Sequence, residues 1–93
     1  MIKIEWDNEK NENLKLNRDV CFEDVERAIL DNQLIDILPH FNQEKYPKQN
    51  ILIVLLNNYI HYVPYVRNDE KLFLKSIVPS RKYNKVYNVK DKQ

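Results

Sequence analysis

The sequence has 93 residues and a net charge of +1, and its length indicates one small domain over residues 1–93. Its composition, 43% hydrophobic and 31% charged, is that of a folded protein and not of a disordered chain. The longest apolar run, Ile51 to Leu56, is far shorter than the roughly 18 residues of a membrane span, and the start lacks the apolar run of a signal peptide, so we expect a cytoplasmic protein without membrane contact. The absence of glycine excludes glycine-rich phosphate loops, and the single cysteine excludes an internal disulfide.

The first predicted elements are a short strand and two helices. Ile2–Trp6 alternates apolar and polar residues, as a strand does. Asp7 is placed to cap a polar helix over residues 10–17, and residues 22–30 show the spacing of an amphipathic helix that ends at Asp31-Asn32. The residues expected to face the core are Leu14, Leu16, Phe22, Val25, Ala28 and Ile29.

Strands follow the two helices. Leu34–Leu38 is predicted as a strand and residues 39–50 as a polar loop. The apolar runs 51–56 and 59–66 flank Asn57-Asn58, which predicts a hairpin because Asn tolerates positive φ. Residues 67–70 then form a turn before a last strand over 72–78. We therefore expect an α+β fold, with a short N-terminal strand and two helices packed on a small antiparallel sheet.

Charge is distributed unevenly along the chain. Residues 1–44 hold five basic and eleven acidic residues, a net charge of −6, whereas residues 71–93 hold seven basic and one acidic residue, a net charge of +6. A basic C-terminal segment on an acidic body indicates an anionic partner, of which nucleic acid is the first candidate. The alternative is a basic tail that only aids solubility, because Lys90 and Lys92 lie at the end of the sequence.

Cationic and aromatic residues on the last strands are the candidates for chemistry. One face of the strand 59–66 is expected to carry His61, Tyr65 and, just beyond it, Arg67, while Lys75 follows on the next strand. Such a set suits the cleavage of RNA, whose 2′-hydroxyl is an internal nucleophile, so the protein need only position it, move protons and neutralise charge. The simpler interpretations are that Arg67 is solvated and that His61 is a half-buried sheet residue.

Neither a metal nor a cofactor is expected. The only cysteine and the two histidines, Cys21, His40 and His61, show none of the paired spacings of zinc sites. Residues of the loop, among them His40, Glu44 and Tyr46, have no partner that the sequence identifies.

Three segments resemble the BrnT-type toxins. Trp6-Asp7, followed by Lys10-Asn11, is similar to the opening W-D-x-x-K-N of that family, and residues 21–25 (CFEDV) resemble the start of its second helix. Residues 77–82 (IVPSRK), with Tyr87 downstream, resemble its closing motif, although Pro79-Ser80 replaces a Ser-Ala pair. The three segments occur in the family's order and span nearly the whole chain.

The resemblance implies a RelE-like fold and a metal-independent ribonuclease toxin of a type II toxin–antitoxin pair. Its partners would be RNA and a cognate antitoxin, in a homodimer or a larger complex with the antitoxin. By position, Arg81, Lys82 and Tyr87 match the closing motif and Lys75 replaces a basic residue of the last strand. Together with the strand residues named above and the basic segment, this makes Arg81, Lys82, Tyr87 and His61 the catalytic candidates and Tyr65, Arg67, Lys75 and Lys85 the substrate-binding candidates.

Two alternatives remain open at this stage. The first is a non-catalytic RNA- or protein-binding module of the same fold, docked through the acidic helices or the basic strand. The second is an unrelated small α+β enzyme, for which the sequence offers no positive motif.

Overall fold

A computed structural model describes residues 3–87. Ile2 of the predicted first strand, and Lys90 and Lys92 of the basic tail, lie outside these described residues. Within them the fold is α+β, as predicted, and contains a mixed six-stranded sheet. The elements are β1 (Lys3–Trp6), α1 (Asn8–Arg18), α2 (Phe22–Leu30), β2 (Leu34–Pro39), β3 (Asn50–Leu56), β4 (Tyr59–Asn68), β5 (Lys71–Leu74), β6 (Val78–Pro79) and α3 (Arg81–Tyr87).

The strands lie in the order β1-β5-β4-β3-β2, and β6 pairs with β4. Strands β2 to β5 form the predicted antiparallel meander. The short N-terminal strand makes the sheet mixed, because β1 pairs with β5 in parallel. Alternation of apolar residues reveals a strand but not the direction of its neighbour, so the sequence could not supply this pairing.

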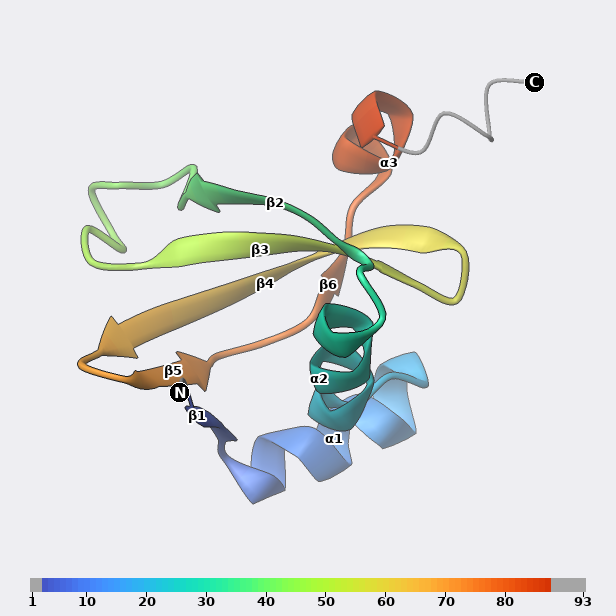
Figure 1. The fold of residues 1–93 in the computed structure, drawn as a ribbon, viewed down its shortest axis with the longest axis horizontal. Coiled ribbons are helices and arrows are strands. Elements are labelled where there is room, and N and C mark those ends of the chain that lie inside the picture. Colours follow the sequence, from blue (N-terminus) through green and yellow to red (C-terminus); the bar gives the residue numbers. More distant parts are fainter. Residues whose placement is uncertain (1–2, 88–93) are drawn as a thin grey trace.

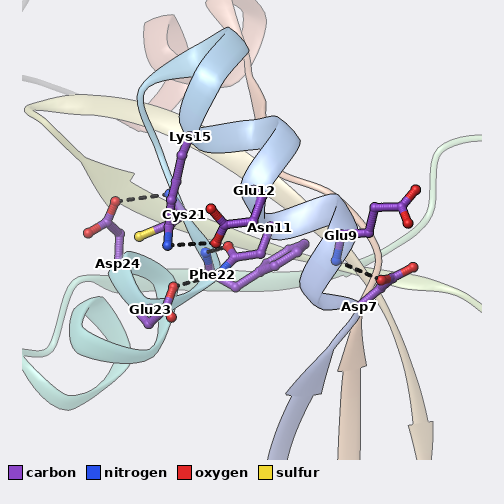
Figure 2. Close-up of polar contacts among 9 residues, drawn as sticks. All are labelled: Asp7, Glu9, Asn11, Glu12, Lys15, Cys21, Phe22, Glu23 and Asp24. Atoms are coloured by element: carbon purple, nitrogen blue, oxygen red, sulfur yellow. Dashed lines mark hydrogen bonds and ion pairs between the residues drawn. The ribbon is translucent and has the colours of Figure 1, made fainter.

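Polar side chains fix the corner between α1 and α2 (Figure 2). Asp7 caps α1 by accepting a hydrogen bond from the backbone nitrogen of Glu9 at 2.9 Å, as predicted. Asn11 is buried within α1; its Oδ1 accepts from the backbone nitrogen of Phe22 at 2.7 Å, and its Nδ2 donates to Glu23 at 2.8 Å. One asparagine therefore satisfies a donor at the start of α2 and joins the two helices.

The two faces of the sheet carry two separate apolar clusters. Leu52 and Val54 of β3 pack with Phe22 and Val25 of α2 on one face. Alternate residues of the same strand, Ile51 and Ile53, pack with Tyr83 and Tyr87 of α3 on the other face. In Figure 1, α1 and α2 accordingly lie together, while α3 lies apart from them beyond the strands.

Leu16 does not face the core. Leu14 is 3% exposed, as predicted, whereas the side chain of Leu16 is 84% exposed. Two residues apart on an α-helix point to nearly opposite sides, so α1 has one apolar anchor at this point and not two.

Turns in this glycine-free chain use Asn and Asp at positive φ, as predicted. Asn57 and Asn58 have φ of 52° and 63° and form the hairpin between β3 and β4. Among residues 3–87, all the positions at positive φ are Asp19, Asn32, Asn57, Asn58 and Asp69.

The C-terminal segment differs from its prediction. The expected strand 72–78 is divided into β5, which ends at Leu74, and the short β6, which pairs with β4. After Pro79 the chain forms α3, which was not predicted. Ser80 caps it, since its Oγ accepts from the backbone nitrogen of Tyr83 at 3.1 Å. The cations that the sequence placed after a strand therefore lie on a helix.

Candidate nucleic-acid interface

The structure divides the predicted site residues between the two faces of the sheet. His61, Tyr65 and Arg67 do share one side of β4, but this side faces α1 and α2, and Tyr65 is buried in their core. Arg81, Lys82, Lys85 and Tyr87 all belong to α3, which packs on the opposite face. The eight residues therefore do not form a single site.

His61 has the environment of a core residue. The residue is 6% exposed, and its Nδ1 lies 3.0 Å from the carbonyl oxygen of Tyr59. Burial lowers the pKa of His61 below its usual 6.5. Its neutral ring is thus hydrogen bonded to the backbone and buried on the face of the sheet opposite α3.

The cations of α3 are exposed. Arg81, Lys82 and Lys85 point to solvent, and none of them forms an ion pair within the described part of the chain. Lys82 lies over the ring of Tyr83, with its Nζ 5.6 Å from the ring centroid. These charges are available to an anionic ligand.

A continuous row of aromatic rings runs from α3 to the loop between β2 and β3. In order it comprises Tyr87, Tyr83, Tyr62, Phe41, His40 and Tyr46. Successive ring centroids are 4.4–6.3 Å apart, the range in which aromatic pairs interact. We refer to these six residues as the aromatic row.

Tyr62 joins the two halves of the aromatic row. Its ring is 6.3 Å from that of Tyr83 on α3 and 5.3 Å from that of Phe41 in the loop. Phe41 is 56% exposed, which is high for such a large apolar ring. Nothing in the sequence connects the loop residues His40 and Tyr46 with the C-terminal cations; the density of aromatic residues in the loop is the one available signal.

A β-bulge connects Tyr87 to the sheet. Leu34 pairs with Val54 and Asp36 with Ile53, so Ile35 is an extra residue on β2. This bulge turns Asp36 to the α3 face, where its Oδ2 accepts a hydrogen bond from the hydroxyl of Tyr87 at 3.0 Å. That bond raises the pKa of Tyr87 above its usual 10.0, so the phenol is protonated at neutral pH.

Two further lysines lie beside the loop end of the row. The Nζ of Lys45 is 5.4 Å from the ring centroid of Tyr46, and Lys75 borders the same hollow as Phe41 and Tyr62. Rings that can stack on bases, next to cations that can contact phosphates, are the combination that single-stranded nucleic acid requires.

No three His, Cys, Asp or Glu side chains gather as a metal-binding group within residues 3–87. No helix in that range is both long and apolar enough to cross a membrane. No family model, no curated protein and no solved structure matches this sequence.

Proposed function

We propose that this protein binds single-stranded RNA along the aromatic row and cleaves it without a metal, as a cytoplasmic toxin that a cognate antitoxin neutralises. The observation that carries the proposal is the aromatic row itself, flanked by the exposed cations Arg81, Lys82 and Lys85, which form no ion pair with any residue between positions 3 and 87. Bases would stack on the rings while the cations hold the phosphates.

The proposed reaction assigns roles to the residues on the α3 face and leaves out those on the other face. Arg81 and Lys82 neutralise the charge that develops on phosphate as the 2′-hydroxyl attacks and the bond to the 5′-oxygen breaks, which leaves a 2′,3′-cyclic phosphate and a 5′-hydroxyl. Lys75 and Lys85 hold the backbone on either side. The proton-transfer role passes from His61 to the pair of Tyr87 and Asp36, because this pair lies on the α3 face and His61 does not. Tyr65 and Arg67, on the face with α1 and α2, have no role in this scheme.

The arrangement of elements supports the RelE-like part of the proposal. N-terminal helices against an antiparallel meander, followed by a basic C-terminal segment, is the order that the resemblance to BrnT-type toxins implies. The resemblance is also the reason for expecting a partner antitoxin, in a homodimer or a larger complex with it.

Controlled expression tests the proposal. The wild type, Arg81→Ala and the control Lys10→Ala, which changes an exposed cation on α1, are induced while growth and total RNA are followed. We expect arrest and RNA decay with the wild type and the control but not with Arg81→Ala. Purified wild type should still cleave single-stranded RNA in excess EDTA. No arrest and no RNA decay from folded wild type would refute the toxin function.

RNA binding without cleavage is the second candidate function. It is favoured by two observations: the hydroxyl of Tyr87 is engaged by Asp36, and His61 is buried on the face of the sheet opposite α3. This alternative predicts that RNA stays intact, and that its binding depends on Arg81 and weakens steeply with salt.

A further inference from the structure

A hollow of about 480 Å³ lies at the loop end of the aromatic row. Its volume is within the range of small-ligand sites, roughly 300–1,000 Å³. Its walls come from the loop between β2 and β3, from β4 and from the segment between β5 and β6; they include Phe41, Lys45, Tyr46, Gln49, Tyr62, Lys75 and Ser76. None of these residues except Lys75 was a predicted site residue.

Hydrogen bonds within the loop fix the shape of the hollow. The backbone nitrogen of His40 donates to the carbonyl oxygen of Gln49 at 3.1 Å, and that of Tyr46 donates to the carbonyl oxygen of Asn42 at 2.9 Å. The side chains of His40 and Asn42 accept from the backbone nitrogens of Asn42 and Lys45 at 3.0 and 3.2 Å. The hollow is therefore formed before any ligand arrives, which reduces the entropy lost on binding.

The hollow offers both stacking surfaces and free polar groups. Phe41, Tyr46 and Tyr62 present rings, and Lys45 and Lys75 bring two positive charges. The side-chain amide of Gln49 and the hydroxyl of Ser76 also line it, and neither makes a hydrogen bond with another described residue. An amide can form a two-point contact with a base edge, while ammonium groups contact base acceptors or the flanking phosphates.

We propose that this hollow binds one unpaired purine base of the RNA and thereby gives the protein a base preference. The base would stack on Phe41 and Tyr46, and the amide of Gln49 would contact its edge. A purine is favoured because it has the larger face for stacking and presents N7 as an additional acceptor to Lys45 or Lys75. This inference rests on the proposed binding of RNA but not on its cleavage.

Fluorescence anisotropy with short labelled RNAs tests the inference. The probes are oligouridylates of about ten nucleotides, either unmodified or with one central A, G or C. We expect the wild type to bind the A and G probes about tenfold more tightly than the U and C probes. Gln49→Ala and Phe41→Ala should reduce this preference to less than about twofold, with weaker effects on the binding of oligouridylate.

Two lysines of one loop provide a matched control. Lys45 lines the hollow and Lys48 does not, although both are exposed. Lys45→Ala should therefore weaken the binding of purine probes more than Lys48→Ala, and circular dichroism verifies that both variants are folded.

The outcomes separate this inference from the proposed function. Binding of no probe at all would overturn both proposals. Equal binding of all four probes would overturn only the base pocket. A purine preference that survives Gln49→Ala and Phe41→Ala would place the base elsewhere and would also overturn it.

Discussion

Replacing Asn11 by alanine should destabilise the fold more than the same substitution at any other asparagine of α1. Asn11 is 2% exposed, and its Oδ1 is the acceptor for the backbone nitrogen at the start of α2 (Figure 2). In Asn11→Ala the nitrogen of Phe22 has no partner and, because Phe22 is fully buried, water cannot replace the lost acceptor.

The expected loss can be estimated term by term. A buried backbone donor without a partner costs about 1–3 kcal/mol. The second bond, to the exposed Glu23, adds no more than about 0.5 kcal/mol, and the higher helix propensity of alanine returns a similar amount. Asn11→Ala should therefore lower the free energy of unfolding by about 2 kcal/mol. For a domain of this size that corresponds to a decrease in melting temperature of about 8–16 °C.

Urea titration of the wild type, Asn11→Ala and Asn13→Ala measures the effect. Asn13 lies on the exposed side of the same helix, so Asn13→Ala should leave the stability unchanged or raise it slightly. Equal losses in the two variants would refute the argument, because the loss would then reflect helix composition and not the buried contact.

The pH dependence offers a second test of the same contact. Donation from Asn11 lowers the pKa of Glu23 below its usual 4.5. The stabilisation from this bond is therefore present above pH 4.5 and is lost as the pH falls through the lowered pKa. The difference in stability between the wild type and Asn11→Ala should shrink in that acidic range; a difference that did not change would contradict the role of Glu23.

The remaining predictions concern a helix end, a hydroxyl and a buried ring. Asp19 ends α1 with φ of 55°, a conformation that glycine adopts without steric cost, so Asp19→Gly should raise the free energy of unfolding by about 0.5–1 kcal/mol in thermal melts. The control Asp31→Gly, at φ of −93°, should lower it. Tyr87→Phe removes the hydrogen bond to its carboxylate partner and should cost about 1 kcal/mol in urea unfolding; Tyr83→Phe should cost much less, and equal costs would refute this. Since burial lowers the pKa of His61, stability should fall as the pH drops from about 7 to 5, and His61→Gln should weaken this dependence; an unchanged profile would argue against it.

Local signals in the sequence predicted most of the N-terminal part and the meander. Two conformations are encoded within a few residues: Asp7 caps the helix that follows it, and Asn57-Asn58 forms the turn between two apolar runs. The parallel partner of β1 and the division of the last strand depend on contacts between distant residues, which periodicity does not encode. α3 was missed because its only local signal is the cap at Ser80 ahead of a short, basic, aromatic segment.

The candidate site was less predictable than the fold. The alternation of side chains along a strand correctly placed His61 and Tyr65 on one side of β4, but it does not indicate which side the helices cover. The cations of α3 were recognised from the concentration of charge and from the resemblance of residues 77–82 to the closing motif, not from any sign of a helix. The loop that carries Phe41 and Tyr46 was not connected with them, because Tyr62 links the two segments only through the folded sheet.

The bulge at Ile35 determines which face of the sheet the side chain of Asp36 points to. If Ile35 were paired in a regular ladder without a bulge, Asp36 would follow the side-chain direction of Leu34, two residues before it, toward α1 and α2. Tyr87 would lose its acceptor, and a carboxylate would approach the apolar core. Deletion of Ile35 would make Leu34 and Asp36 adjacent, so they would still point to opposite faces and Asp36 would still face α3. Related sequences that keep this surface should therefore have either the bulge or a β2 that is one residue shorter, but not a regular strand of the present length.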